Sequence, residues 1–466
     1  MNILFVASEA TPFAKTGGLA DVIGSLPAAL TARGERAAVV LPAYRENVYP
    51  TAPREAYRRL WIPLGAGYAV RITHAVARGV DFYFVDCPPL YDRVGIYGHS
   101  DDYLRFGVLS MAALGVARYL FLPDIIHCHD WQTGLLPVYL RENFGGDPTY
   151  ASVKTLFTIH NLGYQGQFGP AALAPLGLNP RWFNPSQLEF FGNLNLLKAG
   201  IAWSDRVSTV SPSYAREIQT REYGFGLDGF LAQHGPVEGI LNGADYDHWS
   251  PEHDPFIARN YSADDLRGKR ECKRQLIAEM GLPTDTLERP VIGMVSRFAA
   301  QKGFDLIAEV GSRLLAEDAA MTVLGSGETG YQDMFRSLAQ TYPRKVGLRV
   351  GYDEAISHRI EAGADMFLMP SRYEPCGLNQ MYSLRYGTVP VVRATGGLDD
   401  TIDETTGFKF RDYAGIALLD AVGLGLKAYR DPGRWTMRMR AGMRKDFSWN
   451  ASAVEYMRLY RRLKGC

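Results

Sequence analysis

Short apolar runs alternate along the chain with longer segments in which apolar residues recur at helical spacing. Near-continuous apolar runs separated by helices are typical of parallel strands that are covered on both faces. The runs fall into two series, the first at 3–7, 37–41, 82–85, 125–128, 155–159, 207–210 and 239–241, and the second at 291–295, 321–324, 346–350, 366–369 and 389–392. The pattern predicts an α/β protein with two doubly wound, Rossmann-like domains.

The break between the two series falls in a polar segment rich in Gly, Asp, His and Pro, a composition that suits a hinge. We therefore expect an N-terminal domain at 1–242, a hinge at 243–255 and a C-terminal domain at 256–447. Beyond these, apolar residues recur at helical spacing over 449–463, and Ser448 is placed to cap that helix. The spacing predicts a helix that docks on a protein core.

Composition and charge narrow the class of protein. The chain has 50 basic and 50 acidic side chains, a balance that argues against a nucleic acid or a membrane surface as its main partner. We find no apolar run long enough for a transmembrane span, and the first strand begins so early that we expect no signal peptide. The five cysteines are scattered without a C-x-x-C pair, which fits a reducing cytoplasm better than a disulfide framework or a zinc site.

A glycine-bearing loop, Lys15-Thr16-Gly17-Gly18, follows the first predicted strand and precedes a helix predicted at 21–33. It matches neither the P-loop nor the G-x-G-x-x-G pattern. Backbone N–H groups in such a loop, the helix N-terminus and the Lys15 ammonium can all approach an anion. The loop therefore predicts a site for a phosphate-bearing ligand, with an ordinary strand–helix turn as the alternative.

Polar and aromatic side chains follow several strands of the first series, and ligands bind beyond the carboxyl ends of strands in open parallel sheets. These residues are Glu9, Asp21, Asp130, Trp131, His160 and Asn161. Carboxylates, amides and imidazoles bind hydroxyl groups, and an indole packs on the C–H face of a sugar, so the set suits a polyhydroxylated ligand. His127 and His129 share a strand face, but no further ligands follow at metal-site spacing, and we expect no metal there.

Two clusters in the second series suit a phosphorylated sugar. Arg297 and Lys302 follow the strand at 291–295. Arg297 offers a planar fork and Lys302 a point charge for phosphate oxygens. The alternative is that the two form a solvated basic pair on the surface. Glu374 stands just before a helix predicted at 379–385, whose first N–H groups need acceptors. Those donors belong to Cys376, Gly377 and Leu378, and a further glycine turn follows at Thr395-Gly396-Gly397. Cys376 as a catalytic nucleophile is the rival interpretation, but no partner base is evident.

Seven motifs in family order resemble those of the bacterial glycogen synthase and plant starch synthase family. They are S-E-x-x-P-x-x-K-T-G-G-L-A-D at 8–21, H-x-H-D-W at 127–131, T-I-H-N-L-x-Y-Q-G at 158–166, I-L-N-G-x-D at 240–245, S-R-x-x-x-Q-K-G at 296–303, P-S-R-Y-E-P-C-G-L at 370–378 and T-G-G-L-D-D-T at 395–401. Each motif is moderately specific, and the ordered set, which spans nearly the whole chain, is highly specific.

The resemblance implies a GT-B glycosyltransferase, in which two Rossmann-like domains face each other across a cleft that holds the active site. The last helix, at 448–466, would pack back on the N-terminal, acceptor-side domain, and the C-terminal domain would bind the donor. The implied reaction transfers glucose from ADP-glucose to the non-reducing 4-hydroxyl of an α-1,4-glucan such as glycogen, with retention at the anomeric carbon. No cofactor and no metal are expected, and the oligomeric state is not implied.

The resemblance also implies roles for individual residues. Arg297 and Lys302 would neutralise the leaving diphosphate, Glu374 would orient the donor glucose, and the carbonyl or ring of His160 would stabilise the anomeric carbon. The donor-binding residues would be Lys15, Gly17, Gly18, Asp21, Asn242, Tyr352, Cys376, Gly377, Leu378, Thr395 and Gly396. The acceptor-side residues would be Glu9, Asp130, Trp131 and Asn161.

Some points depart from the pattern or stay open. Tyr382 stands where many retaining GT-B enzymes have a second glutamate, and the stretch at 81–102 matches only loosely. No carboxylate is assigned to a double displacement, so attack from the same face, assisted by the leaving phosphate, is favoured. The alternatives are a silent glycan-binding protein, a sucrose- or trehalose-type transferase, and an oxidoreductase, against which the missing G-x-G-x-x-G argues.

Overall fold

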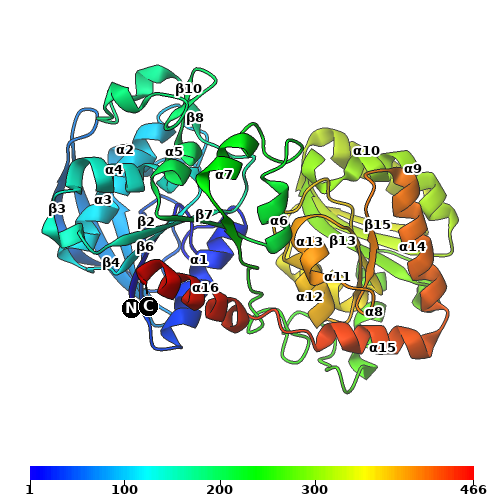
Figure 1. The fold of residues 1–466 in the computed structure, drawn as a ribbon. Helices are drawn as coiled ribbons and strands as arrows, with labels where there is room; N and C mark the ends of the chain where they lie inside the picture. The colour runs from blue at the N-terminus through cyan, green and yellow to red at the C-terminus, as the bar shows by residue number, and fades with distance from the viewer. Residues whose placement is uncertain (466) are drawn as a thin grey trace. The chain divides into compact units, whose positions relative to one another are not determined.

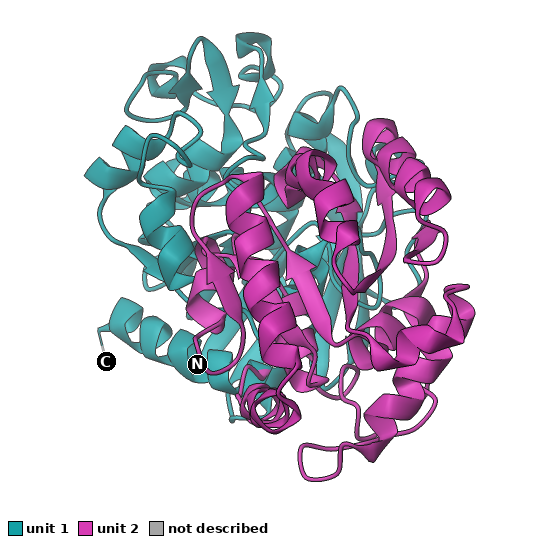
Figure 2. Cartoon of the chain, turned by 90° about the vertical axis from the view of Figure 1, so that its right-hand side faces the viewer, with its two compact units in different colours: residues 1–243, 449–466 teal, residues 244–448 magenta. Residues whose placement is uncertain are grey.

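The computed structural model describes residues 1–465 and divides them into two compact units. Unit 1 comprises Met1–Gly243 and the C-terminal segment that begins at Trp449, and unit 2 comprises Ala244–Ser448 (Figure 2). The chain therefore crosses between the units twice. Ala244 and Ser448 form a parallel β-bridge, so the two crossing segments run side by side where they enter and leave unit 2.

Unit 1 is built on a nine-stranded sheet in the order β12-β11-β7-β6-β1-β2-β5-β4-β3. Seven strands are parallel and correspond to the seven predicted for the first series: β1 (Asn2–Val6), β2 (Arg36–Pro42), β5 (Val80–Asp86), β6 (Ile125–His129), β7 (Lys154–Ile159), β11 (Arg206–Thr209) and β12 (Val237–Gly239). β12 begins two residues earlier than predicted. Because β1, β6 and β7 are parallel neighbours, the residues that follow them gather at one edge of the sheet.

The sheet of unit 1 is mixed, not wholly parallel as predicted. β3 (Arg54–Ile62) and β4 (Tyr68–Ala77) pair in antiparallel fashion at its edge, and β4 is also antiparallel to β5. Both strands keep exposed side chains among their buried ones, so neither forms a continuous apolar run. A small second sheet, of β8 (Gln167–Phe168), β9 (Glu189–Phe190) and β10 (Asn193–Asn195), was not predicted either, because such short strands show no period.

Helices α1 (Gly18–Thr31) and α16 (Trp449–Lys464) lie side by side in unit 1, although they come from opposite ends of the chain (Figure 1). Val22 and Leu26 of α1 share one buried cluster with Tyr456 and Tyr460 of α16. The remaining helices of unit 1 are α2 (Pro88–Tyr91), α3 (Asp102–Tyr119), α4 (Leu135–Phe144), α5 (Leu196–Trp203), α6 (Pro212–Glu217) and α7 (Asp228–His234). Within residues 1–465, no helix has both the length and the apolar character that a membrane crossing requires.

Unit 2 contains a six-stranded, fully parallel sheet in the order β15-β14-β13-β16-β17-β18. Its strands are β13 (Val291–Phe298), β14 (Ala320–Gly327), β15 (Val346–Val350), β16 (Met366–Met369), β17 (Val389–Arg393) and β18 (Phe408–Phe410). The first five were predicted, and the short β18 was not.

Helices cover both faces of the unit 2 sheet, as the apolar strands require. One core contains side chains of α9 (Phe304–Ala316), α14 (Gly415–Tyr429) and α15 (Pro432–Met443), and the other contains side chains of α8 (Arg267–Glu279) and α11 (Glu354–Gly363). The other helices of unit 2 are α10 (Thr329–Thr341), α12 (Asn379–Arg385) and α13 (Gly396–Thr401). β13 contributes to both cores because successive side chains alternate between the faces.

The segment expected to act as a hinge, 243–255, is largely packed on unit 2. Ser250 and Asp254 are buried there. Trp249 stacks on Tyr382 of α12, with ring centroids 4.2 Å apart. The polar composition of this segment therefore reflects specific hydrogen bonds and stacking within unit 2.

Candidate active site

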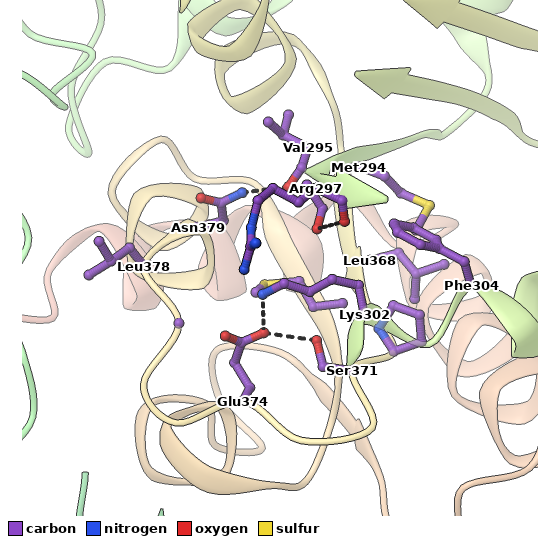
Figure 3. Close-up of a pocket in the computed structure, with 14 residues that line it drawn as sticks. Met294, Val295, Arg297, Lys302, Phe304, Leu368, Ser371, Glu374, Leu378 and Asn379 are labelled. Atoms are coloured by element: carbon purple, nitrogen blue, oxygen red, sulfur yellow. Dashed lines mark hydrogen bonds and ion pairs between the residues drawn. The ribbon is translucent and has the colours of Figure 1, made fainter. Parts of the chain in front are cut away.

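A pocket of about 210 Å³ opens beyond the carboxyl ends of β13 and β16 in unit 2 (Figure 3). Its wall includes five of the residues predicted from the sequence: Arg297, Lys302, Glu374, Gly377 and Leu378. They come from the end of β13 and the loop after it, and from the loop between β16 and α12. The pocket lies where the topology of a parallel sheet places a ligand.

Lys302 and Glu374 form an ion pair inside this pocket. Lys302 Nζ lies 2.6 Å from Glu374 Oε2, and the Ser371 hydroxyl donates to the same oxygen at 2.9 Å. The side chains of Lys302 and Glu374 are only 20% and 7% exposed. A carboxylate this buried needs partners, and the two donors supply them. Both bonds use Oε2, and neither uses Oε1.

Backbone contacts between two loops fix the position of Lys302. Gly303, the next residue, has a φ of +74°, and a Cβ atom there would lie 2.0 Å from the carbonyl oxygen of Pro370, so only glycine fits. The Arg372 N–H donates to the Gln301 carbonyl at 2.8 Å, which joins the loop after β13 to the loop after β16. The distance between Lys302 and Glu374 is therefore set by the backbone as well as by their charges.

The glycine turn at 395–397, predicted to bind the donor, packs on the chain beside Glu374. A Cβ atom at Gly396 would lie 1.9 Å from the Glu374 carbonyl oxygen, and the Gly397 N–H donates to that oxygen at 3.1 Å. Neither Thr395 nor Gly396 is among the residues that line the pocket. The structure therefore gives these glycines a packing role that supports Glu374.

Other predicted residues of unit 2 lie at or outside the pocket. Arg297 is exposed, and Figure 3 shows its guanidinium group extending toward Lys302. Cys376 is buried and is not among the pocket-lining residues, and its carbonyl accepts a hydrogen bond from the Gln380 amide at 3.0 Å. Tyr352, in the loop between β15 and α11, is outside the pocket wall and 86% exposed.

In unit 1, Glu9 holds the predicted anion-binding loop. Its carboxylate accepts hydrogen bonds from the Thr16 N–H and hydroxyl, from the Gly17 N–H at 3.1 Å, and from the Tyr97 hydroxyl. The Gly17 N–H was predicted to face a ligand, but it donates its hydrogen bond to Glu9 instead. The Gly18 N–H, at the N-terminus of α1, is therefore the glycine donor that can bind a ligand. Glu9 was predicted to bind the acceptor, but in the structure its carboxylate holds this loop in place.

The two charged residues predicted at the same loop pair with each other. Lys15 Nζ lies 2.7 Å from Asp21 Oδ1, and the two side chains are 48% and 26% exposed. Such an exposed pair is worth little in stability and can rearrange around a ligand.

Asp130 and His160 meet where β6 and β7 end. Asp130 adopts a φ of +58° and accepts a hydrogen bond from the His160 N–H at 2.7 Å. Burial raises the pKa of Asp130 to about 7, although bonds from the N–H groups of His160 and Asn161 lower it. Burial lowers the pKa of His160 to about 3, so its ring is neutral at physiological pH. The His160 ring bonds to His129, with Nε2 2.9 Å from His129 Nδ1.

Two further histidines lie behind His160 in the sheet. His127 bonds to the Tyr460 hydroxyl of α16 and to Thr158, and its ring packs 4.0 Å from that of His129. Burial lowers the pKa of both His127 and His129 well below the usual value. The H-x-H motif is therefore a buried, neutral, hydrogen-bonded array that supports His160.

The depressed pKa of His160 predicts a pH-dependent stability difference. An imidazole with a lowered folded-state pKa contributes stability above its unfolded pKa of about 6.5, and that contribution is lost as the pH falls toward 3. His160→Asn should therefore flatten the fall in unfolding free energy between pH 6 and pH 4 by about 1.4 kcal/mol per pH unit. Urea denaturation of both proteins tests this, with the exposed His253 changed to Ala as control. Parallel curves for wild type and His160→Asn would contradict it.

The remaining predicted residues of unit 1 are mostly packed. Trp131 contacts Phe106 and Phe168, and a Cβ atom at Gly166 would lie 2.4 Å from its ring. Asn161 accepts a hydrogen bond from the Gly163 N–H, which shapes its own loop. Asn242 is 7% exposed, and its Oδ1 has no hydrogen-bond partner within the described part of the chain.

Comparisons with known proteins find relatives over nearly the whole chain. A family model described as "Starch synthase catalytic domain" matches residues 2–233, and "Glycosyl transferases group 1" matches residues 284–435. The chain is 51% identical to a protein named glycogen synthase from Koribacter versatilis, over 100% of this chain and 98% of the relative. It is 46% identical to the glycogen synthase of Myxococcus xanthus, over 99% of each chain. This chain belongs to the glycogen and starch synthase family.

Solved structures show the same relationship. The catalytic domain of starch synthase IV from Arabidopsis thaliana, bound to ADP and acarbose, matches with a TM-score of 0.90 and 34% identity, over 100% of this chain and 99% of the other. Sucrose-phosphate synthase from Thermosynechococcus elongatus, at 18% identity and a TM-score of 0.64, shares the fold alone. The predicted GT-B fold class and the predicted glycosyltransferase class are confirmed.

Several supporting residues of this glycosyltransferase were not assigned roles from the sequence. Ser371 and Thr16 lie inside motifs that carry the family resemblance, so the motifs themselves were a signal for them. Tyr97 lies in the stretch at 81–102, where the resemblance is loose, and its hydrogen bonds to Glu9 and Ser8 reveal it. Asn379 donates to the Val295 carbonyl at 2.7 Å and fastens α12 to β13.

Proposed function

We propose that this enzyme elongates an α-1,4-glucan such as glycogen by transferring glucose from ADP-glucose to the non-reducing 4-hydroxyl, with retention of configuration. The observation that carries the proposal is the pocket of unit 2, where Arg297, Lys302 and Glu374 come together. Two cations suit a diphosphate, and a buried carboxylate suits sugar hydroxyls. The full-length identity to proteins named glycogen synthase supports the choice of product.

The proposed chemistry in unit 2 is electrostatic. When the glycosidic bond of the donor breaks, negative charge develops on the departing diphosphate, and preorganised cations lower that barrier most effectively. Arg297 would bind phosphate oxygens through its planar fork, and Lys302, held by Glu374, would act as a point charge. Glu374 Oε1 would accept a hydroxyl of the donor glucose. The N–H groups of Gly377 and Leu378, at the pocket wall, would add donors.

In unit 1 we assign anion binding to Lys15 and to the Gly18 N–H at the start of α1. His160 would act at the anomeric carbon through its backbone carbonyl and a neutral ring, because its lowered pKa disfavours an imidazolium next to developing positive charge. Asp130 would hold the His160 backbone, and Trp131 and Asn161 would shape the acceptor side. Tyr352 would stack on the adenine, for which its exposed ring is suited.

We propose that transfer needs no metal ion, because Arg297 and Lys302 supply the charge that Mg²⁺ supplies in many phosphate-handling sites. We also propose a cytoplasmic location. It is supported by Cys87, Cys128, Cys272 and Cys376, which are buried and form no disulfide among the described residues, whereas Cys466 lies outside them. Attack of the acceptor from the same face as the leaving phosphate remains the proposed route to retention.

The test is incorporation of labelled glucose into glycogen by purified protein, with ADP-glucose and UDP-glucose compared in the presence of EDTA. We expect rapid incorporation from ADP-glucose. Absence of incorporation from either donor, with glycogen still bound in a pull-down, would instead identify a silent glycan-binding protein. Incorporation from UDP-glucose alone would overturn the assignment of the donor.

A further inference from the structure

Three side chains outside the pocket converge in unit 2. They are His248, from the segment after the first crossing between units, and Glu354 and His358, from α11. One nitrogen or oxygen atom of each lies within 4.8 Å of the others. His248 Nε2 already lies 2.9 Å from Glu354 Oε1. None of the three lines the candidate active-site pocket.

His358 is the buried member of this cluster, and one of its nitrogens is unsatisfied. Its side chain is fully buried, and its Nδ1 lies 2.8 Å from Asp254 Oδ2. Its Nε2 is also buried and, among the described residues, has no hydrogen-bond partner. A buried polar atom without a partner is costly and calls for an explanation. If Nδ1 donates its proton to Asp254, Nε2 carries a lone pair, which is the form that binds a metal.

Packing holds the cluster in place before any ligand binds. The Trp249 ring stacks on His358, with centroids 3.7 Å apart and planes 10° apart. Glu354 and His358 are four residues apart on one helix, so their side chains point from the same face. Asp353 caps that helix by accepting from the Ile356 N–H at 2.9 Å. Asp254 is itself fixed by the buried Tyr386 hydroxyl.

We propose that His248, Glu354 and His358 form a binding site for a divalent transition metal of the Zn²⁺ type. Two imidazoles and a carboxylate are common zinc ligands, and a water would complete four-fold coordination. Asp254 would orient the metal-bound imidazole as the second-shell carboxylate does in many zinc sites. Ligand atoms of a tetrahedral zinc site are about 3.3 Å apart, so a modest movement of the exposed His248 and Glu354 side chains would complete the site.

The ion would fasten the segment after the first crossing to α11, which begins directly after the loop that carries Tyr352. The site would be structural, and the inference does not depend on the proposed transferase reaction. It changes one expectation from the sequence, that the chain binds no metal. That expectation came from the family resemblance and from the spacing of histidines and cysteines, whereas His248 and Glu354 are 106 residues apart.

The test is a Co²⁺ titration of untagged, metal-free, full-length protein followed by visible absorption, with Zn²⁺ as competitor. We expect one Co²⁺ per chain, displaced by one Zn²⁺. His248→Ala and Glu354→Gln should each weaken Zn²⁺ binding at least about 10-fold, which is at the lower end of the effect of losing an outer-shell partner. The matched control is His253→Ala, an exposed histidine of the same segment that bonds to a backbone carbonyl and should bind Zn²⁺ like wild type.

Two results would overturn the proposal: no stoichiometric Co²⁺ binding, or unchanged affinity in both His248→Ala and Glu354→Gln. Both changed side chains are exposed, so these variants should fold, which circular dichroism verifies. Asp254→Asn, if it folds, should weaken Zn²⁺ binding about 10–100-fold without removing a ligand. Metal affinity and glucose transfer are measured separately, so failure of one leaves the other standing.

Discussion

Glu374→Ala is expected to lower turnover at least about 100-fold while ADP still binds with nearly wild-type affinity. In the proposed mechanism Glu374 binds the glucose unit and not the nucleotide. The carboxylate is buried, and its Oε2 is held by Lys302 and Ser371, so it is already placed for the transition state. Turnover is measured with ADP-glucose and glycogen, and ADP affinity by calorimetry.

Glu374→Gln separates charge from shape in this experiment, because glutamine keeps an acceptor for Ser371 but removes the negative charge beside Lys302. Glu328→Ala is the matched control. Glu328 is an exposed carboxylate that accepts from the Ala300 N–H at 3.2 Å, outside the pocket wall, and its loss should leave turnover unchanged. Equal losses of turnover and ADP affinity in Glu374→Ala would refute the proposed role.

Lys302→Ala should lower kcat/KM by roughly 30- to 1000-fold, which corresponds to about 2–4 kcal/mol of transition-state stabilisation. The ammonium group lies in a pocket that is largely screened from water, where a fixed cation acts more strongly on developing charge than it does in solvent. Steady-state kinetics with ADP-glucose measure the effect, and Lys302→Arg should recover part of the rate because it restores the charge.

Arg372→Ala removes the same charge from the neighbouring loop and serves as control. Its guanidinium pairs with Asp305 at 2.9 Å and is 52% exposed, so its contribution to transfer should be small. A near-wild-type rate for Lys302→Ala would remove Lys302 from the mechanism. If Arg372→Ala lowers kcat/KM as much as Lys302→Ala does, the rate depends on the net positive charge of this region and not on the position of Lys302.

The sequence predicted most of the sheets because buried parallel strands are apolar on both faces. All seven parallel strands of unit 1 and five of the six strands of unit 2 have both ends within three residues of the ends of the predicted runs. β3 and β4 were not predicted because each has exposed side chains, which interrupt the apolar run. The exposed edge of a mixed sheet is therefore hard to recognise from apolar runs alone.

Some of the residues predicted for the site line the pocket, but the contacts around them were not predicted. Arg297, Lys302 and Glu374 could be grouped in advance because each follows a parallel strand of the same sheet. The sequence could not predict that Glu9 accepts the hydrogen bond of the Gly17 N–H. Nor could it predict that Gly396 packs on the Glu374 carbonyl. Such contacts depend on loop conformations, which have no period in the sequence.

The sequence by itself determined the family, the fold class and the residues that carry the proposed chemistry, because local patterning and ordered motifs encode them. Tertiary structure alone decided which of those residues support others and which face the pocket. It also brought His248 together with Glu354 and His358, and Tyr97 together with Glu9. The physical reason is that contacts between distant segments arise from packing and from the need to satisfy buried polar groups, and neither leaves a periodic signal in the chain.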